Sequence, residues 1–376
     1  MNPDEHASVD PRAIWILSSF SGAGGVEKLL STLSGGLAAA GHPVQLVLIK
    51  QRGPFVAQID PRVRVHKLAG NSSRTALPSL TRLMREQQPR TVLVAKERSA
   101  QLLLRCRARC GWPRRIVFQC NTHISQSFQH RPALVRWYRL RRVARILRQV
   151  DEVVAVSSGV AADLQHIGGE PVRPTVIHNP LITPQLVEQA RSPREPALTI
   201  PGRYLLASGR LSRQKGFDTL LRAFAKLPVA LVPMLVILGD GKDRDALLKL
   251  ADELGIRDRL QLPGFVANPF PWMAQAAAFV LSSRWEGFGN VLAEAMALGT
   301  PVISTRCPSG PEEILEEGRL GPLVPVDDAE ALATAIRELL DQPPDRAALR
   351  QSAQRFALET GVNRYALLLG RKTDSA

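Results

Sequence analysis

Residues 277–305 read AAFVLSSRWEGFGNVLAEAMALGTPVIST and decide the fold. The apolar run at 277–283 predicts a buried strand, since both of its faces are apolar. After the turn EGFGN, residues 290–299 predict a helix that ends at Gly299, because glycine commonly follows the last helical turn. Residues 300–305, TPVIST, predict the next strand. A strand, a helix and a second strand in this order indicate a βαβ unit and an α/β fold.

The same alternation of short apolar runs and helical patterns continues along the chain. Further strands are predicted at 13–19, 43–49, 63–68, 91–95, 115–120, 152–157, 174–179, 203–209, 234–241 and 259–265. Segment 184–200 carries Pro, Ser and charge without a strand pattern, and we interpret it as a linker. With 376 residues, the chain is predicted to form two Rossmann-like doubly wound α/β domains, residues 1–190 and 191–358, that face each other across a ligand-binding cleft.

The basic charge of the chain lies in its N-terminal half. Residues 1–190 contain 26 Lys and Arg against 12 Asp and Glu, whereas residues 191–376 contain 23 against 22. From Arg98 to Arg148 there are 13 Arg and no Lys, Asp or Glu. Such a block implies an anionic partner, which can be phosphate groups, an anionic membrane surface or nucleic acid.

Composition excludes several classes of protein. No apolar run approaches the roughly 20 residues that span a bilayer, and the start, MNPDEHASVD, is too polar and acidic for a secretory signal. We therefore expect a cytoplasmic protein or one that lies on a membrane. The four cysteines lack the spacing and the clustered His of a zinc site, so we expect reduced thiols and no bound metal.

The turn in the opening stretch carries the chemistry. Gly287 and Gly289 let the backbone approach a ligand closely, and the helix that follows offers unpaired amides to a diphosphate. These amides belong to Asn290, Val291 and Leu292. Glu294, in the second helical turn, can accept hydrogen bonds from ribose hydroxyls, and Glu286 can reach sugar hydroxyls. The alternative is two solvated acids beside an ordinary glycine turn, but the complete strand–turn–helix–strand pattern favours a binding site.

At these residues the C-terminal half closely resembles the retaining glycosyltransferases of family four, which have the GT-B fold. The matching segments are SGRLSRQKGFDTLLRAF (208–224), LVILGDG (235–241), 262–305 and CPSGPEEIL (307–315). The resemblance is looser over residues 1–190, where SGAGGVEKLL matches. It also implies that the last segment, 359–376, is a helix that crosses back to the N-terminal domain.

The resemblance implies roles for further residues. Arg210 and Lys215 are expected to bind the donor diphosphate and to stabilise the charge that grows on the leaving nucleotide, so no metal is needed. His123 is expected to hydrogen-bond the donor sugar. Together with Glu286, these three residues are the predicted catalytic set. The predicted nucleotide-sugar site comprises Gly24, Gly25, Arg210, Lys215, Gly264, Glu286, Phe288, Gly289, Asn290, Val291, Leu292 and Glu294.

The resemblance also implies the reaction. A hexose or N-acetylhexosamine moves from a nucleotide sugar to a hydroxyl with retention, by same-face attack in which the leaving phosphate helps to deprotonate the acceptor. UDP is favoured as the nucleotide by its frequency in the family, and no cofactor beyond this donor is expected. Residues 307–311 resemble a loop of bacterial surface-glycan enzymes, so the expected acceptor is lipid-linked, or a lipopolysaccharide or polysaccharide, and the expected place is the cytoplasm or the cytoplasmic face of the inner membrane.

The arginine-rich segment leaves several interpretations open. Residues 130–149 have helical spacing and mix an apolar stripe with Arg131–Arg148. Such a helix fits an anionic membrane surface, a phosphate-bearing acceptor or a solvated basic face. Rival functions are a sugar-nucleotide epimerase of the same fold, a nucleic-acid-binding protein and a catalytically inactive scaffold. Nucleic acid is not the expected partner, because no zinc finger or RNA-binding aromatic motif is present.

Overall fold

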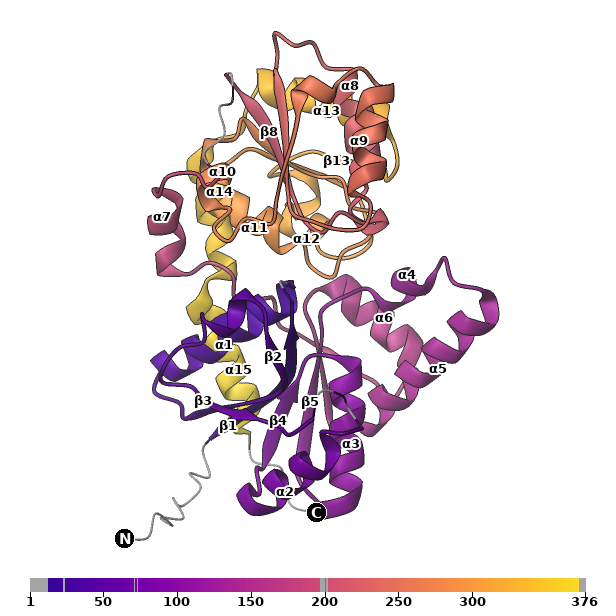
Figure 1. Cartoon of the computed structure of the whole chain (residues 1–376), viewed down its shortest axis with the longest axis vertical. Coiled ribbons are helices and arrows are strands. Elements are labelled where there is room, and N and C mark those ends of the chain that lie inside the picture. The colour runs from indigo at the N-terminus through magenta and orange to yellow at the C-terminus, as the bar shows by residue number, and fades with distance from the viewer. Residues whose placement is uncertain are drawn as a thin grey trace. The chain divides into compact units, whose positions relative to one another are not determined.

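The computed structural model describes residues 13–22, 24–70, 72, 74–196, 200 and 202–371 (Figure 1). The chain divides into two compact units. Unit 1 contains the chain up to Val156, Ala161–Pro180 and the chain from Leu358 onward. Unit 2 contains Ser157–Val160 and Leu181–Ala357.

Unit 1 is built on a seven-stranded parallel sheet with the order β3-β2-β1-β4-β5-β6-β7. Its strands are β1 (Ile14–Ser21), β2 (Val44–Arg52), β3 (Arg64–Lys67), β4 (Thr91–Val94), β5 (Arg115–Cys120), β6 (Glu152–Ala155) and β7 (Thr175–Val176). The strand order reverses between β1 and β4. In doubly wound sheets, ligands bind at the carboxyl ends of the strands beside such a reversal.

Seven α-helices accompany this sheet in the described chain. They are α1 (Gly25–Ala39), α2 (Leu77–Gln87), α3 (Glu97–Cys110), α4 (Ile124–Phe128), α5 (Ala133–Gln149), α6 (Ser158–Gly168) and α15 (Leu358–Gly370). Figure 1 shows α15 beside α1, with which it packs. Val362, Tyr365 and Leu368 of α15 lie in the core of unit 1, and Arg115 of β5 donates a buried hydrogen bond to the Leu368 carbonyl (2.8 Å).

Unit 2 is built on a six-stranded parallel sheet with the order β10-β9-β8-β11-β12-β13. Its strands are β8 (Tyr204–Ser208), β9 (Met234–Leu238), β10 (Leu260–Gly264), β11 (Ala278–Leu281), β12 (Val302–Thr305) and β13 (Leu323–Val324). Its helices are α7 (Pro184–Ala190), α8 (Phe217–Ala225), α9 (Arg244–Glu253), α10 (Phe270–Gln275), α11 (Asn290–Ala297), α12 (Pro311–Ile314), α13 (Ala329–Asp341) and α14 (Arg346–Ala353).

The structure confirms two Rossmann-like α/β units and every strand predicted from the sequence. The linker prediction for 184–200 is wrong in its first part, because residues 184–190 form α7, which buries Leu186 and packs against α10 in unit 2. The division of the chain falls at Leu181. The final helix, predicted within 359–376, begins at Leu358 and belongs to unit 1, and residues 372–376 lie outside the described chain.

Within the described residues, no helix combines the length and the apolar character that crossing a bilayer requires.

Candidate functional site

The turn between β11 and α11 is tightly built. Gly289 precedes α11 with a φ of +99°, a conformation that favours glycine. The loop after β12 closes on this turn, and a Cβ on Gly310 would lie only 1.8 Å from the carbonyl oxygen of Phe288. The Glu286 amide donates to the Pro308 carbonyl across 3.3 Å. The glycines therefore allow two backbone segments to meet at the start of the helix.

Glu286 and Lys215 meet although 71 residues separate them. The Lys215 Nζ and the Ser283 hydroxyl each donate to Glu286 Oε1 across 2.6 Å. The side chain of Glu286 is 8% exposed and that of Lys215 is 16% exposed. Two residues that the sequence predicted separately thus form a largely buried ion pair at the carboxyl ends of β8 and β11.

Cys307 lies beside this ion pair. Burial, reinforced by the negative charge of Glu286, raises the pKa of the Cys307 thiol to about 12. The thiol therefore stays protonated at neutral pH, which is its weakly nucleophilic form.

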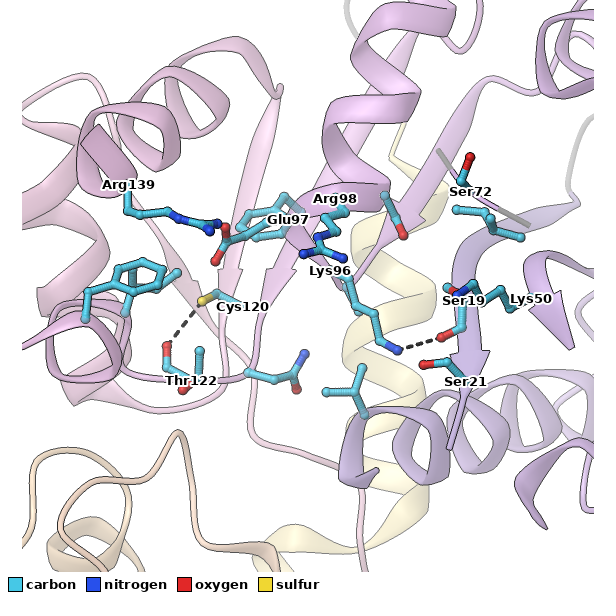
Figure 2. A pocket seen from close by; sticks show the side chains of 18 residues that line it. Ser19, Ser21, Lys50, Ser72, Lys96, Glu97, Arg98, Cys120, Thr122 and Arg139 are labelled. Carbon is cyan, nitrogen blue, oxygen red and sulfur yellow. Dashed lines mark hydrogen bonds between the residues drawn. The ribbon is translucent and has the colours of Figure 1, made fainter. Parts of the chain in front are cut away.

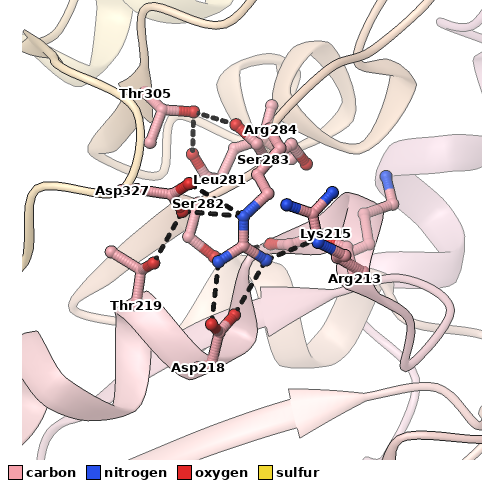
Figure 3. Close-up of polar contacts among 10 residues, drawn as sticks. All are labelled: Arg213, Lys215, Asp218, Thr219, Leu281, Ser282, Ser283, Arg284, Thr305 and Asp327. Atoms are coloured by element: carbon pink, nitrogen blue, oxygen red, sulfur yellow. Dashed lines mark hydrogen bonds and ion pairs between the residues drawn. The ribbon is translucent and has the colours of Figure 1, made fainter. Parts of the chain in front are cut away.

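Arg284 fixes the turn that carries Lys215 (Figure 3). Its guanidinium binds the Asp218 carboxylate at 2.7 and 3.0 Å and the Asp327 carboxylate at 2.7 Å. It also donates to the Arg213 carbonyl at 2.8 Å. Burial alone would raise the pKa of Asp218, but the hydrogen bonds and charge of Arg284 bring it below its usual value. The sequence analysis missed this network, because its members are far apart in the chain.

The loops after β8, β9 and β10 are joined through their backbones. The Leu211 amide donates to the Asp240 carbonyl at 3.0 Å, and the Gly239 amide donates to the Gly264 carbonyl at 2.7 Å. Gly264 has a φ of +90° and open space where a Cβ would stand. Arg210 projects from the first of these loops as an exposed side chain, so a cation stands at the carboxyl end of the sheet.

The residues at the start of α11 differ in the pairing of their amides and in burial. The Leu292 amide donates to the Gly289 carbonyl at 2.9 Å, so the prediction that it is unpaired is wrong: a tight first turn satisfies it. Asn290 and Val291 are half-buried, and Glu294 is 3% exposed.

Phe288 turns its side chain away from solvent. The residue is 2% exposed, and its ring packs edge-on against Phe356 with 5.0 Å between ring centroids. The ring therefore belongs to the core of unit 2 and is not offered to a ligand.

Gly24 and Gly25 begin α1 in unit 1. A Cβ on Gly24 would lie 2.4 Å from a carboxylate oxygen of Glu27, whereas a Cβ on Gly25 would meet nothing within 4 Å. The Glu27 carboxylate accepts a hydrogen bond from Lys96 Nζ at 2.7 Å, and the same nitrogen donates to the Ser19 carbonyl at 2.5 Å. Gly24 thus leaves room for a partly buried ion pair at the first turn of α1.

His123 lies between β5 and α4. Its Nδ1 is 3.3 Å from Asp163 Oδ2, but the geometry is not that of a hydrogen bond. Asp163 accepts hydrogen bonds from the amides of Ile124 (2.7 Å) and Ser125 (3.2 Å). Burial alone would raise the pKa of Asp163, but His123 and Ser125 bring it below its usual value. Asp163 therefore holds the loop that carries His123.

A cavity of about 580 Å³ opens at the carboxyl ends of β2, β1, β4 and β5 (Figure 2). Its charged lining residues are Lys50, Lys96, Glu97, Arg98 and Arg139, and its apolar ones include Ile49, Phe118 and Phe128. Among the described residues, His123 does not line it. The cavity lies beside the reversal of strand order in unit 1. The sequence motifs gave no signal for it, because its residues come from six separate segments.

The sequence predicted that no metal ion is bound, and this stays a prediction. In the described part of the chain, no group of three or more His, Cys, Asp and Glu is arranged to hold a metal ion.

Two Rossmann-like α/β units in one chain are the architecture of the GT-B fold. Residues 23–183 match the family model described as Glycosyltransferase Family 4, and residues 191–356 match the one described as Glycosyl transferases group 1. The chain therefore belongs to the family-four glycosyltransferases and is a glycosyltransferase. Neither the epimerase hypothesis nor the nucleic-acid hypothesis gains support from these matches.

Individual relatives agree with this assignment. The chain is 34% identical over 231 residues to the lipopolysaccharide core biosynthesis glycosyltransferase LpsE of Rhizobium meliloti (strain 1021). This match covers 60% of this chain and 66% of that protein. It is 26% identical over 349 residues to N-acetylgalactosamine-N,N'-diacetylbacillosaminyl-diphospho-undecaprenol 4-alpha-N-acetylgalactosaminyltransferase of Campylobacter jejuni subsp. jejuni serotype O:2. That match covers 89% of this chain and 91% of the relative.

A solved structure shows the same fold. Anabaena Alr3699/HepE in complex with UDP and glucose has a TM-score of 0.77 at 20% sequence identity, and the match covers 95% of this chain and 99% of that one.

Proposed function

We propose that this enzyme transfers a hexose or N-acetylhexosamine from a UDP-sugar to a hydroxyl of a lipid-linked, lipopolysaccharide or polysaccharide acceptor, with retention of the anomeric configuration. The Lys215–Glu286 ion pair beside the start of α11 carries the proposal. It puts a cation, a carboxylate and a helix N-terminus at one edge of the sheet of unit 2.

The cations of unit 2 suit the diphosphate of the donor. Lys215 is held near the strand ends by Glu286, while Arg210 is exposed in the same loop after β8. Ammonium and guanidinium groups that face a leaving diphosphate stabilise the negative charge that develops as the glycosidic bond breaks. On this proposal the two cations do the work that a metal ion does in other transferases.

Glu286 and Glu294 suit hydroxyl groups. Carboxylates accept hydrogen bonds from neighbouring sugar hydroxyls, and such charge-assisted bonds are stronger than neutral ones. We assign Glu286 to the transferred sugar and Glu294 to the ribose. Glu286 is committed to Lys215 and Ser283 through one oxygen, Oε1, so its role here is to orient the donor. Retention then follows from same-face attack assisted by the leaving phosphate.

The acceptor is assigned to the cavity of unit 1. Its volume of about 580 Å³ is within the range of small-molecule sites, and it combines apolar surface with Lys50, Arg98 and Arg139. The printed names of two relatives, a lipopolysaccharide core enzyme and an enzyme that acts on a diphospho-undecaprenol-linked sugar, support an acceptor of this kind.

The start of α5 supports peripheral attachment to a membrane. Leu134, Trp137 and Tyr138 are 76%, 50% and 63% exposed, and arginines flank them. Aromatic and basic side chains together favour the interface of an anionic bilayer. Replacing Trp137 by Ser should lower the fraction of protein that sediments with anionic vesicles, and unchanged sedimentation would contradict the attachment.

The reaction is tested with radiolabelled UDP- and GDP-sugars and a detergent extract of bacterial lipid-linked and lipopolysaccharide acceptors. We expect transfer from a UDP-sugar that survives chelation of divalent cations, and an α-linked product, from an α-linked donor, by NMR. Conversion of the donor into an isomeric nucleotide sugar, without a glycosylated product, would contradict the proposal. An inverted product would contradict retention alone.

A further inference from the structure

A second hollow of unit 1 lies between α3 and α5 and is lined by arginine. It has a volume of about 510 Å³, and its lining includes Arg105, Arg107, Arg142 and Arg145, which we call the arginine groove. Gln101 and Gln149 complete its polar lining, and no acidic residue lies among the described residues that form it. None of these residues lines the 580 Å³ cavity. The groove is thus a separate concentration of positive charge.

Arg107 is held in place at the edge of the groove. Its guanidinium pairs with the Asp151 carboxylate and donates to the Gln149 carbonyl at 2.6 Å. Asp151 also accepts a hydrogen bond from the Ile116 amide at 2.7 Å. The acid that contacts the groove is therefore already committed, and the charges of Arg105, Arg142 and Arg145 are not neutralised by it.

Arg142 has an unmet hydrogen-bonding capacity. Its Nε is buried and has no hydrogen-bond partner among the described residues. Its charge acts on Glu97: burial raises the pKa of that carboxyl, and Arg142, with Arg139 and Arg98, opposes the rise. A buried donor without an acceptor is uncommon in folded proteins. Since this Nε is enclosed, a phosphate in the groove would reach Arg142 through the outer nitrogens of its guanidinium.

We propose that the arginine groove binds a phosphate group, which accepts hydrogen bonds from Arg142 and is flanked by Arg105 and Arg145. Planar guanidinium groups match phosphate oxygens with two parallel hydrogen bonds, and several arginines around one hollow suit a doubly charged anion. The site shares no residue with the assigned donor and acceptor sites, although the charge of Arg142 also acts on Glu97 of the acceptor cavity.

The phosphate has two possible sources, a soluble phosphate ester or the headgroup of a phospholipid. Tyr138 and Val135 are 63% and 43% exposed and continue the helical row of Arg142 and Arg145, at spacings of three and four residues. Residues at these spacings share one face of a helix. An exposed apolar surface thus adjoins the groove on α5. A phospholipid bound by its headgroup would use this surface for its apolar part, whereas a soluble phosphate ester needs only the arginines.

The test uses the full-length protein and inorganic pyrophosphate, titrated calorimetrically in the presence of excess UDP to occupy the proposed donor site. The groove variant is Arg105→Gln/Arg145→Gln. The control is Arg82→Gln/Arg85→Gln, which removes the same charge from two exposed positions on α2. We expect the groove variant to bind pyrophosphate at least tenfold more weakly and the control to stay within twofold of the unchanged protein.

A second variant, Arg142→Gln, should also weaken binding at least tenfold, and its circular dichroism and melting temperature report whether it is folded. Sedimentation with phosphatidylglycerol–phosphatidylcholine vesicles identifies the source. If the groove variant loses sedimentation with vesicles and the control does not, the phosphate comes from a lipid headgroup. If the groove variant binds pyrophosphate more weakly but sediments with vesicles as the control does, the phosphate comes from a soluble ester. Equal pyrophosphate and vesicle binding by the groove variant and its control would overturn the site. Donor binding, measured separately with UDP, reports on the proposed function.

Discussion

Separating Lys215 from Glu286 gives the most informative test of the donor site. Three variants are needed: Lys215→Met, Glu286→Gln and the two together. Methionine keeps most of the lysine's length without its charge, and glutamine keeps the shape of the glutamate. The Ser283 hydroxyl, which donates to the same Glu286 oxygen at 2.6 Å, stays in each variant.

The stability effect follows from the geometry of the pair. Opposite charges 2.6 Å apart attract by about 6 kcal/mol at an effective dielectric of about 20, and desolvation of the two groups offsets most of this. In Lys215→Met the nearly buried carboxylate of Glu286 loses one of the two hydrogen bonds to its Oε1 and keeps the one from Ser283. We expect a loss of about 3 kcal/mol in the free energy of unfolding. The double variant should recover about half of that loss.

The binding effects of the two changes should differ. Lys215→Met removes the cation that we assign to the diphosphate and should weaken UDP binding by about 2 kcal/mol. Glu286→Gln releases Lys215 from its carboxylate, so UDP affinity should stay the same or rise while sugar transfer falls by about 100-fold. Titration calorimetry with UDP and an initial-rate assay with the UDP-sugar separate these outcomes.

Equal loss of UDP affinity in both single variants would refute this reasoning, because the pair would then act only as a structural unit. Full UDP affinity in Lys215→Met, with the protein folded, would remove Lys215 from the donor site.

Four further changes address other parts of unit 2. Glu294→Gln should weaken UDP binding by about 2 kcal/mol in calorimetry, because a charged acceptor for the ribose is lost. Gly310→Ala should cost about 3 kcal/mol or more of stability in urea unfolding, since its Cβ would lie 1.8 Å from a backbone oxygen. Gly264→Ala, with a φ of +90° but open space, should cost about 1 kcal/mol. Arg284→Gln should destabilise unit 2 by about 2 kcal/mol and flatten its acid dependence. The folded-state pKa of Asp218 lies below the usual value of 3.8. The stability that this carboxylate contributes is therefore fully present above pH 3.8 and is lost as the pH falls through the lowered pKa.

Each of these expectations has a clear contradiction. UDP that binds Glu294→Gln as tightly as the unchanged protein would leave the ribose without its assigned acceptor. Similar losses for the two glycine changes would mean that backbone conformation, and not close contact, dominates at Gly310. An unaltered slope of stability between pH 5 and pH 3 in Arg284→Gln would show that Asp218 gains nothing from the guanidinium.

Most of the fold was predictable because parallel strands are buried on both faces and appear as continuous apolar runs. The strand β13 was missed, since it has only two residues, Leu323 and Val324, too few to show a pattern. Helix α7 was missed for a similar reason: it has seven residues and buries one leucine, so its sequence resembles a polar linker.

The candidate site was predictable only in part. Glycine turns and the residues next to strand ends can be read from the sequence, and Lys215 and Glu286 were found in this way. Side chains that meet across long separations leave no local signal, so the bracing of the Lys215 turn by Arg284 and its two aspartates was missed. The Leu292 amide was wrongly predicted to be unpaired, because the helical pattern does not reveal how tightly its first turn closes.

The packing of α15 in unit 1 has a consequence for synthesis. Val362, Tyr365 and Leu368 complete the core of unit 1. Along the chain, the residues of unit 2 come between these three residues and the rest of that core. The ribosome therefore delivers every strand and helix of unit 2 before the first-made unit receives its final helix. During translation the second unit is expected to finish folding first, and the N-terminal sheet must wait, with part of its apolar surface uncovered, for the last segment to emerge.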